Sequence, residues 1–248
     1  MTKVVLLADG EVGLACVNWI LNEYKNDIGL IVTIEKNDIY RTACNSSVPA
    51  YVYKNCSDLA NKIGDLSIDF HLGLLLWWPK IVKEPLLSIP KNGFVNTHPS
   101  LLPHNRGKHY SFWAIVEECP FGVSLHKVDQ GIDSGDIVSQ SSISVDWTDT
   151  GETLHVKAKD EMVKLFAETY PTLRQSPIEG KPQPKDLGSF HHSSEIDSVV
   201  RIELDRMVSA RSLLNLLRAK TFAGRQGCVF EDNGKLFEVS VQIKEIKS

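Results

Sequence analysis

Short apolar runs that alternate with helical segments constrain the fold of this chain most strongly. Residues 3–9, 29–35 and 70–78 are predominantly apolar, and each run is far too short to span a bilayer. A strand has this composition when both faces of its sheet are buried, as in parallel sheets covered by helices. Segments with helical spacing of apolar residues lie at 10–24 and 56–66. The alternation predicts a doubly wound α/β sheet.

The rest of the chain continues this alternation and then becomes a small β-rich segment. Asn233 and Gly234 separate two strand-like runs, and this pair is typical of a hairpin turn. The predicted fold class is α/β: a Rossmann-like, mostly parallel sheet flanked by helices, plus a small C-terminal helix and β-hairpin module. We expect further strands at residues 48–53, 93–98, 121–129 and 136–145, and further helices at residues 81–88, 108–118, 152–173 and 206–219.

A change of composition marks a domain boundary. Proline and glycine gather between residues 175 and 189, which is typical of a linker or a surface strap. The chain of 248 residues is long enough for one large domain with an appendage. We therefore expect a first domain over residues 1–175, and a linker with the small β-rich module over residues 176–248.

Charge and cysteine content restrict the possible partners and the compartment. The formal net charge of −4 gives no general attraction to nucleic acid or to an anionic membrane. Five cysteines occur without a Cys-x-x-Cys pair, which favours unpaired thiols in a reducing compartment. The acidic residues Asp9 and Glu11 come too early for a signal peptide. These features predict a cytoplasmic protein.

The segment Asn-Thr-His-Pro-Ser-Leu-Leu-Pro, residues 96–103, is the most informative for chemistry. In a strand, Asn96 and His98 point to the same side, and sites in parallel sheets lie at the carboxyl ends of strands. Asp133, in a later loop, can complete an amide, imidazole and carboxylate set of the kind that acyl transfer to an amine requires. Taken singly, a histidine is usually structural, and we interpret His126 in that way.

Two motifs, NTHPSLLPHNRG and VSLHKVDQGIDSGDIV, closely resemble the formyltransferases that use 10-formyltetrahydrofolate. The resemblance covers residues 1–175, which would be the formyltransferase catalytic domain. It is greatest to the branch of sugar-nucleotide N-formyltransferases, because the C-terminal segment resembles the short module of that branch. The resemblance implies that Asn96 and His98 polarise the formyl carbonyl and that Asp133 holds a proton relay.

The resemblance also implies a folate site. Its cosubstrate would be 10-formyltetrahydrofolate, with no metal, and the turn after residues 70–78 would line the pterin pocket. From composition alone, Trp77 and Trp78 are typical of a core. An apolar slot with a few fixed polar groups suits a flat pterin ring. The cofactor-binding residues implied are Leu76, Trp78, Ile81, Val82, Val128, Asp129 and Asp133.

Basic residues near the predicted cleft would bind the second substrate. Arg106 directly follows the Ser-Leu-Leu-Pro loop, and a cation there can pair with a diphosphate. Residues 10–13 depart from the phosphate-cradling loop of the glycinamide ribonucleotide enzymes, which disfavours that substrate. The substrate-binding set expected is Lys80, Ser100, Arg106, Lys108, His109 and Tyr110.

The implied function is transfer of a formyl group to the amine of a dTDP-, UDP- or GDP-linked amino deoxysugar, for a surface polysaccharide such as lipopolysaccharide O-antigen. The partners implied are small molecules and a second copy in a homodimer, without nucleic acid or membrane. One alternative is a methionyl-tRNA formyltransferase, although the acidic chain disfavours RNA binding. Another is a folate-binding or 10-formyltetrahydrofolate-hydrolysing relative.

Overall fold

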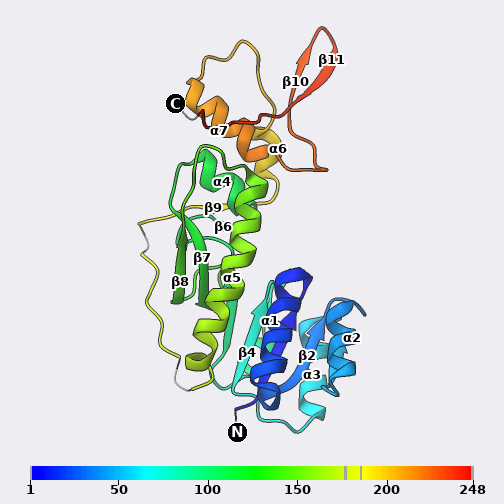
Figure 1. The fold of residues 1–248 in the computed structure, drawn as a ribbon. Coiled ribbons are helices and arrows are strands. Elements are labelled where there is room, and N and C mark those ends of the chain that lie inside the picture. Colours follow the sequence, from blue (N-terminus) through cyan, green and yellow to red (C-terminus); the bar gives the residue numbers. More distant parts are fainter. Residues whose placement is uncertain (1, 176–177, 185, 247–248) are drawn as a thin grey trace. The chain divides into compact units, whose positions relative to one another are not determined.

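The computed structural model describes residues 2–175, 178–184 and 186–246 (Figure 1). Its centre is a seven-stranded sheet with the strand order β3-β2-β1-β4-β5-β7-β8. Short connections between buried strands and helices produce this order, as the alternating sequence predicts. The strands of this sheet are β1 (Val4–Ala8), β2 (Ile28–Thr33), β3 (Ala50–Val52), β4 (Leu72–Leu76), β5 (Phe94–His98), β7 (Phe121–Lys127) and β8 (Ile137–Ile143).

The sheet is mixed, with one reversal that matters for the site. Strands β1 to β5 pair in parallel, whereas β5 and β7 pair antiparallel. The prediction of a mostly parallel α/β sheet is therefore confirmed. His98, the last residue of β5, consequently pairs with Ser124 in the middle of β7, and the last residue of β7, Lys127, pairs with Val95 near the start of β5. The reversal results from the antiparallel pairing of β5 with β7, two strands that are not adjacent in the sequence.

Two small pairs of strands and a set of helices complete the fold. Strands β6 (Arg106–Gly107) and β9 (Phe190–His191) pair in parallel, and β10 (Cys228–Asp232) and β11 (Lys235–Val239) form a hairpin. Asn233 and Gly234 both have positive φ at its turn, as expected for this pair. The helices are α1 (Gly10–Glu23), α2 (Asp38–Asn45), α3 (Cys56–Asp65), α4 (Tyr110–Val116), α5 (Gly151–Leu173), α6 (Glu195–Val199) and α7 (Ala210–Lys220), with 3-10 turns η1 (Lys25–Asp27) and η2 (Leu86–Ser88).

Three local features correct the expectations or add to them. The helix expected at 81–88 is only the turn η2, since Pro85 disfavours helical geometry in the residue before it. Asn55, directly before the predicted helix at 56–66, is the N-cap of α3 and accepts a hydrogen bond from the Asp58 amide at 2.8 Å. Helix α2 was not expected, because its first turn depends on a side-chain cap from Asn37 at the end of a loop.

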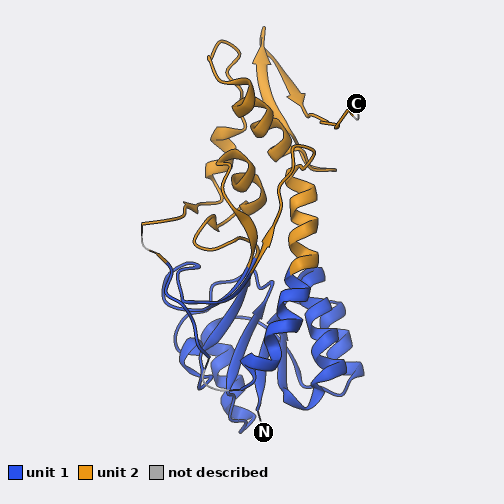
Figure 2. Cartoon of the chain, turned by 60° about the vertical axis from the view of Figure 1, so that its left-hand side comes forward, with its two compact units in different colours: residues 1–98, 124–140, 162–183 blue, residues 99–123, 141–161, 184–248 orange. Residues whose placement is uncertain are grey.

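The chain forms two compact units, each built from three separate segments (Figure 2). Unit 1 comprises residues 1–98, 124–140 and 162–183, and unit 2 comprises residues 99–123, 141–161 and 184–248. The boundary that we predict between residues 175 and 176 falls at a segment, 176–177, that lies outside the described residues. The division of the chain into domains at that point stays a prediction.

The core of unit 1 lies around β1, β2 and β4. Val5, Leu30, Leu75 and Phe94 are buried there, together with Trp78 from the turn after β4. All five cysteines are free thiols. Within the described part of the chain, no helix combines the length and apolar character that crossing a membrane requires.

Candidate active site

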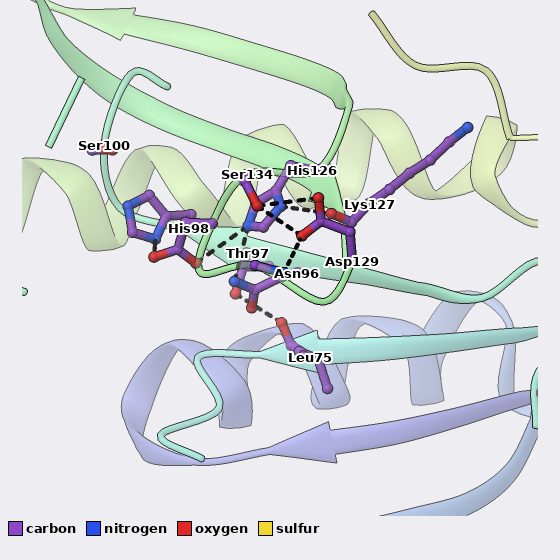
Figure 3. Close-up of polar contacts among 12 residues, drawn as sticks. Leu75, Asn96, Thr97, His98, Ser100, His126, Lys127, Asp129 and Ser134 are labelled. Atoms are coloured by element: carbon purple, nitrogen blue, oxygen red, sulfur yellow. Dashed lines mark hydrogen bonds and ion pairs between the residues drawn. The ribbon is translucent and has the colours of Figure 1, made fainter. Parts of the chain in front are cut away.

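The register of β5 against β7 places the polar side chains of the site. Asn96 lies opposite His126, and His98 lies opposite Ser124. Because alternate residues of a strand share a face, these four side chains share one side of the sheet. The Asn96 Nδ2 atom lies 3.1 Å from the His126 Nε2 atom (Figure 3). His126 thus joins the predicted set of Asn96, His98 and Asp133.

Asp133 approaches this face from the loop between β7 and β8. One carboxylate oxygen lies 3.4 Å from His98 Nδ1, and the other lies 3.6 Å from His126 Nε2. Both imidazoles are almost fully buried, and the carboxylate is mostly buried. The structure therefore brings Asn96, His98 and Asp133 together in unit 1. A charge in such a poorly hydrated place interacts more strongly with its neighbours than a charge in water.

The hydrogen bonds of His126 fix which tautomer it adopts. Its Nδ1 atom lies 2.8 Å from the carbonyl oxygen of Lys127, so Nδ1 carries the hydrogen and donates it. In the neutral imidazole Nε2 is then the acceptor, and it receives a hydrogen bond from Asn96 Nδ2. His126 therefore orients the Asn96 amide. The sequence interpretation of His126 as merely structural missed this contact, and the signal that reveals it is the cross-strand register with Asn96.

Thr97 connects the site to the turn after β4. Its hydroxyl donates to the Leu75 carbonyl at 3.0 Å and accepts from the Trp77 amide at 2.8 Å. Thr97 itself is buried. The turn that we predict to line a pterin pocket is thereby fastened to the strand that carries Asn96 and His98. Composition alone gave no signal for this residue.

The predicted folate residues of the turn after β4 fall into three groups. Trp78 and Val82 are buried in the core of unit 1, and the Trp78 ring packs edge-on against Tyr53 at 5.3 Å. Leu76 is fully buried at the end of β4, whereas Ile81 is 59% exposed. The side chains of Trp78 and Val82 are thus engaged in packing, so backbone groups of this turn are the better candidates for polar contacts with a ligand.

The loop after β7 is held by its own side chains. Asp129 accepts hydrogen bonds from the Gly131 amide at 3.0 Å and from the Ser134 hydroxyl at 2.8 Å. At the start of the loop, the Val128 amide donates to the Phe94 carbonyl at 2.8 Å. The Asp129 carboxylate therefore shapes the loop that carries Asp133. A contact of Val128 or Asp129 with a folate stays a prediction.

Most of the predicted substrate residues belong to unit 2. Ser100 is buried and its hydroxyl donates to the His104 carbonyl at 2.7 Å, so this side chain shapes the Ser-Leu-Leu-Pro loop. Arg106 lies in β6, and its Nε atom is buried without a hydrogen-bond partner among the residues that the structure describes. Lys108 is exposed, as is Lys80 of unit 1. A buried donor on Arg106 is a group that a ligand oxygen could satisfy.

Tyr110 begins helix α4, and His109 is its N-cap. The His109 ring lies 3.2 Å from the Ser193 carbonyl, and burial of the ring lowers its pKa. The Tyr110 hydroxyl bonds to His155, and burial raises the pKa of Tyr110. Both rings are therefore uncharged near neutral pH and already have protein partners. A role for them in binding a substrate is still a prediction.

The cluster around Asp133 has a geometry that could also bind a cation. His98, His126 and Asp133 each offer one ligand atom, and these atoms lie within 4.8 Å of one another. A structural zinc site has four ligands and a catalytic one has three with an open position. However, His126 Nε2 already accepts a hydrogen bond from Asn96, and a metal ion there would break that bond. The arrangement thus favours hydrogen-bond chemistry over metal binding.

Comparison with protein families and curated proteins gives consistent results. The family model of formyl transferases matches residues 28–170, and the model of the N-formyltransferase dimerization C-terminal domain matches residues 195–245. The bifunctional polymyxin resistance protein ArnA of Wigglesworthia glossinidia brevipalpis is 27% identical over 88% of this chain, and the methionyl-tRNA formyltransferase of Thermodesulfovibrio yellowstonii is 29% identical over 75%. The matched regions cover 34% and 59% of the lengths of these curated relatives.

Solved structures share the fold over nearly the whole chain. A 4-N formyltransferase from Francisella tularensis superposes with a TM-score of 0.81 at 21% identity, covering 99% of both chains. An N-formyltransferase from Helicobacter canadensis, solved with folinic acid and dTDP-3-aminofucose, has a TM-score of 0.75 at 20% identity and covers 94% of this chain and 85% of its own. Since the first family model matches more than half of the residues, this chain belongs to the formyl transferase family.

Proposed function

We propose that this chain transfers the formyl group of 10-formyltetrahydrofolate to the amino group of a nucleotide-linked amino deoxysugar. The observation that carries the proposal is the cluster of Asn96, His98 and Asp133, in which a carboxylate oxygen lies 3.4 Å from His98 Nδ1. An amide donor, an imidazole and a carboxylate are the groups that acyl transfer to an amine uses. Membership of the formyl transferase family supports formyl as the acyl group.

The reaction needs one new bond and one broken bond. The amine nitrogen attacks the formyl carbon, and an electron pair moves to the formyl oxygen to give a tetrahedral oxyanion. Asn96 and His98 donate hydrogen bonds to this oxyanion. Collapse of this intermediate re-forms the carbonyl and breaks the bond between the formyl carbon and N10 of the folate. N10 gains a proton, and the amine nitrogen loses one. Asp133, beside His98, holds the relay through which the amine proton leaves.

The folate and the sugar nucleotide occupy different residues in this proposal. We assign the pterin to the turn after β4, where the Thr97 hydroxyl fixes the backbone of Leu75 and Trp77. We assign the diphosphate to the basic residues Arg106 and Lys108. The buried and unsatisfied Nε atom of Arg106, within the described residues, supports this assignment because a phosphate oxygen would accept its hydrogen.

A sugar acceptor is favoured over tRNA by the C-terminal residues. Residues 195–245 match the dimerization domain of N-formyltransferases, and the Helicobacter canadensis structure with the same fold holds dTDP-3-aminofucose. The net charge of −4 also disfavours a large polyanionic partner. We further propose that the formylated sugar serves the synthesis of a surface polysaccharide, such as an O-antigen, in the cytoplasm.

Mass spectrometry tests the reaction and the acceptor together. Purified protein is mixed with 10-formyltetrahydrofolate and a panel of dTDP-, UDP- and GDP-linked sugars that carry an amine at C3 or C4. Initiator methionyl-tRNA and glycinamide ribonucleotide serve as alternative acceptors in the same assay. We expect one sugar nucleotide to gain the mass of a single formyl group.

Each other result points to a different function. Formyl transfer to methionyl-tRNA alone would make the chain a methionyl-tRNA formyltransferase. Release of free formate without any acceptor would make it a hydrolase. Binding of folate without turnover of any acceptor would leave a folate-binding protein and would overturn the proposal.

A further inference from the structure

A short segment from the predicted linker pairs with the first residue of β8, which follows the loop that carries Asp133. The Ile137 amide donates to the Lys181 carbonyl at 2.8 Å, and the Lys181 amide donates back to the Ile137 carbonyl at 2.8 Å. This pair of bonds is an isolated antiparallel bridge at the start of β8. Residues 162–183 belong to unit 1 together with residues 124–140. The linker therefore contacts the strand that directly follows the Asp133 loop.

The side chain of Gln183 contacts the backbone of the loop at Asp133 and Gly135. Its amide nitrogen Nε2 donates to the Asp133 carbonyl at 2.8 Å and to the Gly135 carbonyl at 2.8 Å. The two hydrogens of one amide group thus hold two carbonyls on both sides of Ser134. The Oε1 atom of Gln183 is buried and has no hydrogen-bond partner in the described ranges of the chain. Gln183 was predicted only as part of a linker.

The loop has a backbone that needs such support. Asp133 has a φ of 53°, in the left-handed region, which is unfavourable for residues with a side chain. A Cβ atom at Gly135 would lie 1.9 Å from the Lys127 carbonyl, so the loop turns back tightly onto the end of β7. Backbone conformations of this kind persist only when the surroundings hold them in place. Gln183 supplies hydrogen bonds at both of these residues.

We propose that Gln183 is a positioning residue, which holds the Asp133 carboxylate in the geometry that faces His98. This inference rests on the proposed formyl transfer for its kinetic consequences, but its structural part stands without it. Because Gln183 acts through Asp133, it affects the chemical step more than the binding of either substrate. A displacement of about 1 Å at such a site can cost on the order of a hundredfold in rate.

The first test is the substitution Gln183→Met, which keeps the length of the side chain and removes its donors. We expect kcat to fall about ten- to a hundredfold, with KM for both substrates within about threefold of wild type. The matched control is Gln175→Met, at an exposed position of the same unit, which leaves kcat unchanged. A rise in KM with unchanged kcat would overturn the positioning role.

The second test asks whether Gln183 acts through Asp133. Gln183→Met is combined with Asp133→Asn, and the residual turnover of the double variant is compared with that of Asp133→Asn alone. Residues that act as a unit have non-additive effects. We expect the addition of Gln183→Met to change the turnover of Asp133→Asn by less than about threefold. If Gln183→Met lowers turnover as much in Asp133→Asn as in the wild-type protein, Gln183 acts independently of Asp133, and the inference would be overturned.

Hydrogen–deuterium exchange provides a test that does not depend on activity. In Gln183→Met, we expect faster exchange of the amides between residues 128 and 137, with unchanged exchange in β1 and β4. Equal exchange in wild type and Gln183→Met would overturn the inference even if formyl transfer is found. Absence of any formylated product from the wild-type protein would overturn the proposed function, while faster exchange in the variant would still support the structural role of Gln183.

Discussion

Thr97 stands between Asn96 and His98 in the chain, yet its side chain serves the neighbouring strand. Its hydroxyl holds the Leu75 carbonyl and the Trp77 amide at the end of β4. A buried backbone group that loses its partner costs more free energy than a surface hydrogen bond contributes. Asn96 and His98, on one side of β5, therefore belong to the proposed reactive set. Thr97, on the other side, holds the adjacent turn.

Substitution of Thr97 tests this division. We expect Thr97→Val to lower the free energy of unfolding by about 1–3 kcal/mol, because the Leu75 and Trp77 backbone groups lose a buried partner. Thr97→Ser keeps the hydroxyl and is the matched control, with a smaller loss. Urea denaturation followed by tryptophan fluorescence measures both. Equal destabilisation by the two variants would mean that the methyl group, and not the hydroxyl, matters.

The proposed catalytic residues make a kinetic prediction. We expect Asn96→Ala and His98→Ala each to reduce kcat by about a hundred- to a thousandfold, since each removes a donor to the oxyanion. The dissociation constant for 10-formyltetrahydrofolate should change by less than about threefold, because these donors act mainly on the transition state. Turnover assays and isothermal titration measure the two quantities. A variant with wild-type kcat would contradict the assigned role of that residue.

At the scale of elements, the start of α5 depends on a buried carboxylate. Asp149 accepts hydrogen bonds from the Thr153 hydroxyl at 2.9 Å, from the Asp146 amide at 2.8 Å and from Lys157 at 2.8 Å. Burial alone would raise the pKa of Asp149, but these donors outweigh it and hold the pKa below its ordinary value of 3.8. The ionised form is therefore the one that stabilises this helix end.

This lowered pKa predicts how stability depends on acid. A carboxyl group with a lower pKa in the folded state contributes its full stabilisation above the unfolded-state pKa, and the contribution is lost as the pH falls through the folded value. We expect Asp149→Asn to be less stable than wild type at pH 7, and the difference in the free energy of unfolding to shrink below about pH 4. A difference that stays constant between pH 3 and 7 would exclude this role.

The elements that the sequence predicts well are those with local causes. The buried strands β1, β2 and β4 follow from their apolar runs, and the hairpin turn follows from Asn233 and Gly234. Strands β6 and β9 were not expected, because each has only two residues and depends on a partner far along the chain. In the site, Asn96, His98 and Asp133 were recognisable from their motifs. His126 and Gln183 were not, since their contacts arise from cross-strand register and from tertiary folding.

At the scale of the whole molecule, the C-terminal module exposes apolar side chains. Met207 is 95% exposed, and Leu236 and Phe237 of β11 are 57% and 43% exposed. Residues 195–245 match a dimerization domain, so a second copy is the partner that we expect to cover such groups. Burial of these side chains between two copies would remove their apolar surface from water.

Light scattering tests this expectation. We expect the wild-type protein to have twice the chain mass of 27.7 kDa and the variant Leu236→Asp to shift toward the monomer. Val156→Glu, at an exposed apolar position on α5, is the control and should keep the wild-type mass. A wild-type protein that is monomeric at micromolar concentration would contradict the prediction.

Removal of metal ions distinguishes a reaction that needs no metal from a metal-dependent reaction. Although His98, His126 and Asp133 could together hold a cation, in the proposed reaction these side chains act only through hydrogen bonds and proton transfer. We expect kcat to be unchanged after dialysis against a chelator, and added zinc to inhibit by displacing the bond between Asn96 and His126. Loss of activity on chelation, restored by one divalent metal, would instead show a metal-dependent reaction.

The contact between Gln183 and the Asp133 loop has a consequence for how this protein can be shortened. A recombinant fragment that stops at residue 175 would contain Asn96, His98 and Asp133, because all three precede that point. It would lack the bridge at Lys181 and the Gln183 amide, both of which belong to the same compact unit as Asp133. Such a truncation would retain every reactive group and lose the support of one of them. Expression of a minimal catalytic fragment therefore needs a C-terminus beyond residue 183.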